Sequence, residues 1–181
     1  MGFPKMLLSF NGKTMIENVI SNVTGSDADN TLVVLGPPLG RLTDIILRSK
    51  VNYCFNINYQ DGMLSSVRCG FKNIPLGFKA ALVLPGDQPL ITSGVINTVI
   101  DAYRASGKGI VIPVHNKKRG HPLLLDSKYI DEINRLEDRE GLRSLAYLFP
   151  DDVLEVETRD SSILRDFDTY EDYRNEVNQI Q

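Results

Sequence analysis

The residue best placed to do chemistry in this sequence is Asp87, which lies in the stretch Pro85-Gly86-Asp87-Gln88-Pro89 directly after the apolar run 80–84. A carboxylate just past the carboxyl end of a buried strand lies where open α/β sheets bind their ligands. Asp87 is therefore a candidate for binding a metal ion or the phosphates of a substrate. The alternative is a turn residue whose carboxylate bonds only nearby backbone amides.

Asp166 and Asp168 form a second pair of carboxylates near the end of the chain, and the segment 162–167 is predicted to be short and extended. Because side chains alternate along an extended segment, these two carboxylates would share one face. With Asp87 they could hold one Mg²⁺, a hard cation that uses few protein ligands and completes its shell with phosphate and water. The alternative is that Asp168 or Thr169 caps a final helix.

Lys5 follows Gly2-Phe3-Pro4, which we interpret as a rigid turn near the start of the chain. An ammonium group in such a loop can act as a point charge on a triphosphate, where negative charge builds up on the leaving group. The alternative is a solvated lysine close to the terminus. The sequence thus offers a cation that could act beside the carboxylates.

The stretch Gly62-Met63-Leu64-Ser65-Ser66-Val67-Arg68 follows a predicted strand and opens a predicted helix. Free backbone N–H groups and the hydroxyls of Ser65 and Ser66 could hold a nucleobase edge or an anion there. An ordinary serine-rich helix start is the alternative.

A basic loop ends in Arg119-Gly120-His121-Pro122. It follows another predicted strand and could orient an anionic second substrate. A histidine beside a proline can equally be structural or exposed rather than catalytic.

The elements that must position these residues alternate between strand and helix. Buried β-branched or apolar runs predict strands, and apolar residues at helical spacing predict helices. The strands are expected at 31–36, 51–57, 80–84, 109–114, 122–125 and 153–158, and the helices at 15–23, 40–49, 62–73, 92–105, 127–136, 140–148 and from 169. Such alternation implies βαβ units and a largely parallel sheet, in an α/β protein with three layers, α/β/α. No linker divides the chain, so we expect residues 1–181 to form one domain.

Composition restricts the possible functions. With 181 residues, 42% of them hydrophobic, and a net charge of −3, the chain suits a single domain with a real core and has no basic run that favours nucleic acid. Two cysteines and two histidines show no metal-binding spacing. No signal peptide and no membrane span of about 18 apolar residues is predicted, so we expect a cytoplasmic protein. Motifs of P-loop NTPases and of Gly-x-Ser-x-Gly hydrolases are missing.

Taken together, these stretches resemble the MobA-like nucleotidyltransferase family, and within it most closely the molybdenum cofactor cytidylyltransferases. Met1-Gly2-Phe3-Pro4-Lys5 is similar to the end of the opening motif Leu-Ala-Ala-Gly-x-Ser-x-Arg-Met-Gly-x-Pro-Lys. Residues 62–70 resemble Gly-Met-Ser-Ser-Ser-Leu-Arg-Ala-Gly, and residues 84–89 resemble Pro-Gly-Asp-Gln-Pro. Residues 119–124 are like Arg-Gly-His-Pro-Val-Leu, and residues 166–173 are like Asp-Ile-Asp-Thr-Pro-Glu-Asp-Tyr. The five matches occur in the family's order along essentially the whole chain.

The resemblance implies a nucleotide-diphospho-sugar transferase-like, Rossmann-like fold and transfer of CMP from CTP to a molybdopterin-type cofactor, with release of pyrophosphate. Lys5 would contact the phosphates, Asp87 would bind Mg²⁺, and Asp166 or Asp168 would supply the second carboxylate. The nucleotide would lie by Pro85, Gly86 and the residues Ser65, Ser66 and Arg68, and the loop Arg119, Gly120, His121 and Pro122 would face the pterin. Such a reaction needs mainly positioning and electrostatic stabilisation from the protein.

The sequence departs from the family pattern at its start, because the family's first strand and its Ala-Gly-x-Ser-x-Arg loop have no counterpart in these residues. We expect a gap in the middle of the sheet and a weakened triphosphate site. A form carrying an upstream strand should therefore turn over CTP and cofactor much faster. Equal turnover by the two forms would contradict this expectation. Alternative functions are guanylyl transfer, nucleotidyl transfer to a sugar or alcohol phosphate, or weak catalysis in a module that delivers the cofactor to a molybdenum oxidoreductase.

Overall fold

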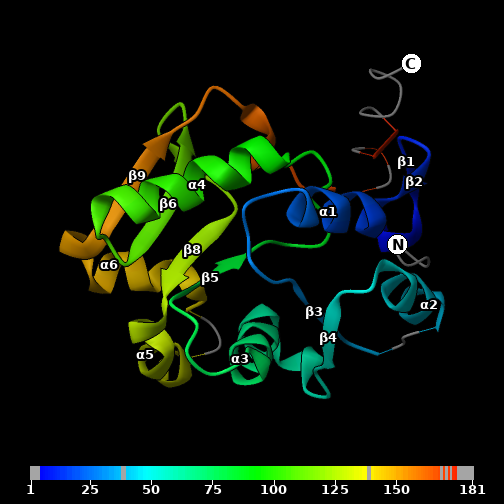
Figure 1. The fold of residues 1–181 in the computed structure, drawn as a ribbon, viewed down its shortest axis with the longest axis horizontal. Coiled ribbons are helices and arrows are strands. Elements are labelled where there is room, and N and C mark those ends of the chain that lie inside the picture. Colours follow the sequence, from blue (N-terminus) through cyan, green and yellow to red (C-terminus); the bar gives the residue numbers. More distant parts are fainter. Residues whose placement is uncertain are drawn as a thin grey trace.

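The computed structural model describes residues 5–37, 40–137, 140–167, 169, 171, 173 and 174. They form an α/β fold in which helices cover both faces of a five-stranded sheet (Figure 1). The predicted fold class is confirmed.

The five-stranded sheet is mixed in direction. Its strands are β5 (Ala80–Val83), β8 (Leu123–Asp126), β6 (Ile110–His115), β7 (Lys118–Arg119) and β9 (Val153–Glu157). β6 runs parallel to β9, whereas β8 runs antiparallel to both β5 and β6. The start of β8 therefore lies beside the carboxyl end of β5, where Val83 pairs with Leu123, and β8 also pairs with the first residues of β6.

A separate parallel pair is formed by β3 (Leu32–Leu35) and β4 (Asn52–Phe55). Within the described residues no ladder joins β3 to β5, so the β3–β4 pair and the five-stranded sheet lie on the two sides of this break (Figure 1).

The three layers follow from the alternation of side chains along the strands. Ile110 and Leu125 point to the face covered by α3 (Met63–Asn73), α5 (Ile130–Arg135) and α6 (Leu145–Leu148). Val111 and Leu124, one residue away, point to the opposite face, which is covered by α4 (Ser93–Ser106). The apolar stripes predicted from the sequence are therefore the core.

The first helix begins as the sequence predicts. Asn11 and Gly12 adopt positive φ angles of 48° and 77° in the turn between β1 (Ser9–Phe10) and β2 (Lys13–Thr14). The Thr14 hydroxyl accepts from the Glu17 amide and the Glu17 carboxylate accepts from the Thr14 amide, which is the capping box that starts α1 (Met15–Thr24). α1 then packs with α2 (Gly40–Ser49) over β3.

One predicted element is wrong. Ser161–Leu164 is a 3₁₀ turn and not part of an extended segment over 162–167, because the Asp160 carboxylate accepts a hydrogen bond from the Ser162 amide and caps a turn. Residues 165–167 form no strand. Alternation along a strand therefore cannot place Asp166 on a shared face with Asp168, which lies outside the described residues. Of the final helix expected from 169, only parts are described, including a bond from the Tyr173 amide to the Thr169 carbonyl.

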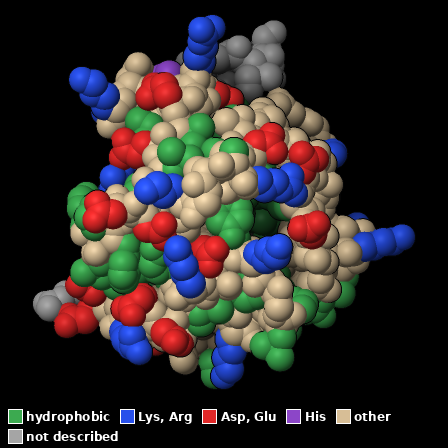
Figure 2. All heavy atoms as spheres, turned by 60° about the vertical axis from the view of Figure 1, so that its left-hand side comes forward, with side chains coloured by type: hydrophobic (Ala, Val, Ile, Leu, Met, Phe, Trp, Pro, Cys, Tyr) green, Lys and Arg blue, Asp and Glu red, His purple; other side chains and the backbone are tan. Residues whose placement is uncertain are grey.

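Charged side chains of both signs are interspersed on the face shown in Figure 2. An anionic substrate reaching that face would meet no broad positive field and would have to be held by a few local groups. None of the helices in the described residues combines the length and the apolar composition needed to cross a membrane.

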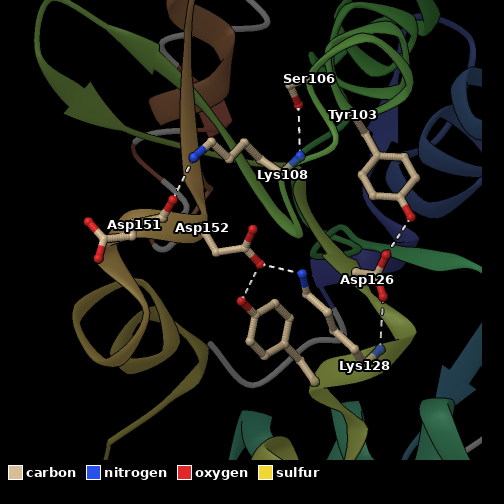
Figure 3. Close-up of polar contacts among 8 residues, drawn as sticks. Tyr103, Ser106, Lys108, Asp126, Lys128, Asp151 and Asp152 are labelled. Carbon is tan, nitrogen blue, oxygen red and sulfur yellow. Dashed lines mark hydrogen bonds and ion pairs between the residues drawn. The ribbon is translucent and has the colours of Figure 1, made fainter.

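A polar cluster lies at the sheet edge where β6 and β9 begin and β8 ends (Figure 3). Asp152 accepts from the Tyr129 hydroxyl at 2.5 Å and lies 2.6 Å from Lys128 Nζ. Burial raises the pKa of Asp152, but the bonds from Lys128, Tyr129 and the Gly109 amide outweigh it and hold the pKa below the ordinary value of 3.8. The carboxylate therefore stabilises the fold in its charged form.

We predict that Asp152→Asn lowers the free energy of unfolding by about 1–2 kcal/mol at pH 7, because charge-assisted hydrogen bonds are lost. The pKa of Asp152 is depressed in the fold, so its contribution is complete above the unfolded-state pKa and is lost as pH falls through the folded-state value. Urea unfolding from pH 7 down to pH 3 should show the two proteins converging below about pH 4.

Asp151→Asn is the matched control for this prediction. Asp151 is exposed, and only its backbone carbonyl accepts a bond from Lys108 (Figure 3). Equal destabilisation by both substitutions, or a difference that does not change with pH, would contradict the assignment.

Candidate active site

Asp87 lies in the loop between β5 and α4, and its carboxylate faces the ammonium group of Lys5. Lys5 Nζ is 2.5 Å from Asp87 Oδ2, and the two side chains keep 29% and 15% of their surface exposed. A sheltered pair of this kind is screened less than a surface ion pair, yet both groups still reach solvent. The structure therefore brings together two predicted site residues from distant parts of the sequence.

Lys5 is positioned by the hydrophobic residues that follow it. Lys5–Leu7 forms a 3₁₀ turn, and Met6 and Leu7 pack into the cluster around Ile16. A Cβ atom on Gly86 would lie 3.4 Å from the Met6 sulfur and 3.3 Å from Ile16 Cδ1. Because Gly86 has no side chain, this apolar cluster packs closely beneath the Asp87 loop.

His121 lies beside the carboxylates, at the start of β8. Its amide donates to the Ile163 carbonyl at 3.0 Å. Burial lowers the pKa of His121 below its usual 6.5, and Arg143 lowers it further, while the charges of Asp87 and Asp166 act in the opposite direction. The imidazole is therefore held neutral at pH 7, although two carboxylates are near enough to act on it.

Asp166 is exposed, and the residue that follows it fixes the backbone there. Phe167 is 3% exposed and packs with Phe10 and Met15. The rings of Phe10 and Phe167 have their centroids 5.7 Å apart. This contact joins the C-terminal segment to the N-terminal hairpin and so brings Asp166 to the same end of the sheet as Lys5 and Asp87.

The donor set of this site fits Mg²⁺. Two carboxylates, Asp87 and Asp166, both lie near enough to His121 for their charges to act on its pKa. Among the described residues no group of three or more acidic, histidine or cysteine side chains is gathered for a metal. Mg²⁺ suits such a site, because it commonly binds one or two carboxylates and takes its remaining ligands from phosphate and water.

The serines predicted to lie by the nucleotide are held by Asn56, a buried residue that the sequence analysis missed. Asn56 Nδ2 donates to Ser65 Oγ at 2.8 Å and to Ser66 Oγ at 3.0 Å. The N-cap of α3 is Gly62, with φ 96° and no side-chain cap bond. The start of α3 thus presents backbone N–H groups that receive no side-chain cap from residue 62, beside two fixed hydroxyls. The signal in the sequence for Asn56 was a polar residue near the carboxyl end of the predicted strand 51–57.

Two predicted site residues make other contacts. The Arg68 guanidinium donates to the carbonyls of Ile133, at 3.1 Å, and Leu136, so it caps the end of α5. Arg119 Nε lies 2.7 Å from Glu155 Oε1, and its guanidinium lies over the ring of Tyr147. In the same loop, the Gly120 amide donates to the Pro113 carbonyl and the His121 amide donates to the Ile163 carbonyl. Arg119 is instead bound to β9. The role predicted for Arg68 beside the nucleotide stays a prediction.

A small hollow of about 240 Å³ adjoins this site. It is lined by Leu90 and by the residues Asp160, Ser161, Ser162 and Arg165, so it lies between the chain that follows Asp87 and the chain that precedes Asp166. Among the described residues, Ser162 Oγ and Gln88 Oε1, which is next to Asp87 in the sequence, are buried and have no hydrogen-bond partner. Buried polar atoms normally have partners, so this part of the structure has unused bonding capacity.

The comparison with known protein families decides the identity. A family described as the MobA-like NTP transferase domain matches residues 1–153. The chain belongs to this family. Among curated proteins, the MobA-like chain is 26% identical over 139 residues to the bifunctional protein GlmU of Francisella tularensis subsp. novicida, covering 76% of this chain and 30% of GlmU. The chain thus spans about a third of that relative's length.

Solved structures share the fold. Rv0371c from Mycobacterium tuberculosis has a TM-score of 0.85 at 20% identity, covering 98% of this chain and 90% of that one, and its manganese complex matches with a TM-score of 0.83 at 19% identity, covering 97% and 91%. Molybdopterin-guanine dinucleotide biosynthesis protein A from Archaeoglobus fulgidus has a TM-score of 0.72 at 15% identity, covering 99% and 91%. CMP:2-keto-3-deoxy-manno-octonic acid synthetase complexed with CTP has a TM-score of 0.76 at 14% identity, covering 97% and 91%. The MobA-like chain therefore has a nucleotidyltransferase fold.

We predict that Gly120→Ala destabilises the MobA-like fold by about 2 kcal/mol, through overpacking against a backbone that cannot easily move. A Cβ atom at position 120 would overlap the Ile163 carbonyl oxygen and lie 2.8 Å from its carbon. The substitution would also displace His121, whose amide donates to that same oxygen. Urea unfolding measures the effect.

Gly94→Ala serves as the control, because a Cβ atom there would meet nothing closer than Thr92 Oγ1 at 3.6 Å, within a helix. It should be neutral or stabilise by up to about 1 kcal/mol. If Gly120→Ala unfolds at the same urea concentration as the unchanged protein, the close approach of residues 120 and 163 is refuted.

Proposed function

We propose that the chain transfers a nucleotidyl group from a nucleoside triphosphate, with CTP as the first candidate, to a phosphate group of a small acceptor. A phosphate oxygen of the acceptor forms a bond to the α-phosphorus, the bond from that phosphorus to the β-phosphate bridge breaks, and pyrophosphate leaves. The observation that carries the proposal is the pair of Lys5 and Asp87, 2.5 Å apart after the end of β5. Open α/β sheets bind ligands at this edge.

Each proposed role follows from the charge and place of the residue. Lys5 would turn its ammonium from Asp87 to the β- and γ-phosphates and stabilise the charge that develops on the leaving pyrophosphate. Asp87 and Asp166 would hold Mg²⁺, with Asp168 as the alternative second carboxylate. The metal would neutralise phosphate charge when bound.

The nucleotide would lie between the Pro85–Gly86 turn and the start of α3. Free N–H groups at a helix start favour negatively charged or electron-rich groups, and Asn56 keeps Ser65 and Ser66 in place beside them. The acceptor would approach past Gly120, His121 and Pro122. The neutral imidazole of His121 can then exchange hydrogen bonds with a phosphate without adding charge.

Structural neighbours support CTP and a divalent cation. One related structure contains CTP and another contains manganese. For the acceptor, a molybdopterin-type cofactor is proposed from the motif resemblance. Guanylyl transfer to the same cofactor is the second candidate, since one neighbour is a molybdopterin-guanine dinucleotide biosynthesis protein.

The assay is pyrophosphate release by the purified chain with Mg²⁺, each of CTP and GTP, and molybdopterin-type cofactor present or absent. We expect release with CTP that depends on the cofactor, and a loss of about 10²–10³-fold in kcat/KM for Asp87→Asn, typical of removing a group that stabilises transition-state charge. Lys5→Met should lower the rate of chemistry more than the affinity for the acceptor.

Asp101→Asn is the matched control for Asp87→Asn, because Asp101 is an exposed carboxylate on α4 whose ion-pair partner, Arg104, is also exposed. It should retain full activity. Full activity in Asp87→Asn would refute the role of that carboxylate, and cofactor-dependent release with GTP but not with CTP would replace the first candidate by the second.

A further inference from the structure

The two cysteines of the chain lie next to each other in the fold. Cys54, on β4, and Cys69, on α3, have their sulfur atoms 3.7 Å apart and are both reduced. A disulfide bond is about 2.05 Å long, so the sulfurs are separated by only about 1.7 Å more than a covalent bond requires. Small rotations of the two side chains can change the sulfur–sulfur distance by this amount.

Close packing of α3 on the β3–β4 pair produces this proximity. Cys54 pairs with Val34 of β3. A Cβ atom on Gly70 would lie 3.2 Å from Val34 Cγ2, and Gly70 follows Cys69 directly. Because position 70 has no side chain, α3 approaches the strands closely enough to bring the two sulfurs together.

The two thiols differ in accessibility. Cys54 is 9% exposed, whereas Cys69 is only partly buried. Burial raises the pKa of the Cys54 thiol to about 12, and the neighbouring Cys69 raises it in the same direction. A reagent in solution therefore meets Cys69 first, and Cys54 is placed to react next with whatever forms on Cys69.

We propose that Cys54 and Cys69 are a site of reversible oxidation, at which a low-molecular-weight disulfide such as oxidised glutathione converts the dithiol into a disulfide that joins β4 to α3. The Cys69 thiolate attacks one sulfur of the reagent, forming a mixed disulfide and expelling one small thiol. Cys54 then loses its proton and attacks the Cys69 sulfur, which expels the second small thiol. The protein loses two electrons and two protons, and the reagent is reduced to two thiols.

The new bond would close a ring between two residues that lie 15 positions apart in the sequence. This ring contains Asn56, Gly62, Ser65 and Ser66, which are the groups that present the start of α3 to a nucleotide. Cys69 lies one helical turn after Ser65, so the cross-link would be adjacent to the bonds made by Asn56. Oxidation would thus restrain the segment from β4 to α3 without replacing any of its polar groups.

The experiment incubates the folded protein with a series of reduced-to-oxidised glutathione ratios and counts free thiols after denaturation in acid. We expect a product two hydrogen atoms lighter than the dithiol, a proteolytic peptide pair joined through Cys54 and Cys69, and full reversal by dithiothreitol. The equilibrium constant against glutathione should be at least 10-fold larger in the folded protein than in urea, because the fold holds the thiols together. The thermal midpoint should rise by roughly 5–10 °C.

Single substitutions separate the two thiols. Cys54→Ser should accept one glutathione at Cys69, whereas Cys69→Ser should leave the buried Cys54 largely unmodified while the protein is folded. Neither readout depends on nucleotidyl transfer, so a failure here is distinct from a failure of the proposed activity. Two free thiols at every ratio, disulfide-linked dimers as the main product, or equal oxidation in the folded and urea-unfolded states would each overturn the proposal.

Discussion

The ion pair between Lys5 and Asp87 is the contact on which the proposed chemistry depends. It joins the beginning of the chain to the carboxyl end of β5, and it places one cation and one carboxylate where an α/β sheet receives its ligand. The ion pair also stabilises the charged Asp87 carboxylate in the protein without substrate. A carboxylate that is only 15% exposed would lose much of its hydration without a partner, and the lysine provides the positive charge that a metal ion would provide in a complex.

The two ends of the chain are brought to this site by hydrophobic contacts and not by the charges themselves. Met6 and Leu7 pack beside α1, and Phe167 packs against Phe10. Burial of such side chains supplies a non-directional driving force of about 1.5–3 kcal/mol each, larger than the usual net gain from a solvent-exposed ion pair. Lys5 and Asp166 can therefore exchange partners at the surface while the backbone beneath them remains in place.

Much of this arrangement follows from local sequence. The helices at 15–23 and 92–105 were predicted correctly, because capping residues and periodic hydrophobicity agree there. Asp87 was placed by a buried strand that ends at Pro85-Gly86. The family resemblance, now confirmed by the match over residues 1–153, added the prediction that these motifs belong to one site, which no single stretch could indicate.

Other features depend on contacts that no local pattern encodes. Arg68 was placed near the nucleotide, but its planar guanidinium matches the free carbonyls at the end of α5, which only tertiary packing brings near. The turn at Ser161–Leu164 is a different case, because the Asp160 cap is a local bond that outweighs the extended pattern. The hydrogen bond from Asn56 to Ser65 and the adjacent sulfurs of Cys54 and Cys69 form only once α3 is packed on β4.

The central claim is that Lys5 and Asp87 separate when substrate binds, the lysine moving to phosphate and the carboxylate to the cation. A crystal structure with CTP and Mn²⁺, using the anomalous scattering of manganese, tests this directly. The account predicts a manganese ion about 2–2.5 Å from an Asp87 carboxylate oxygen, with Lys5 Nζ bonded to a phosphate oxygen and no longer to Asp87. Manganese and CTP bound elsewhere, with the Lys5–Asp87 pair intact, would contradict it.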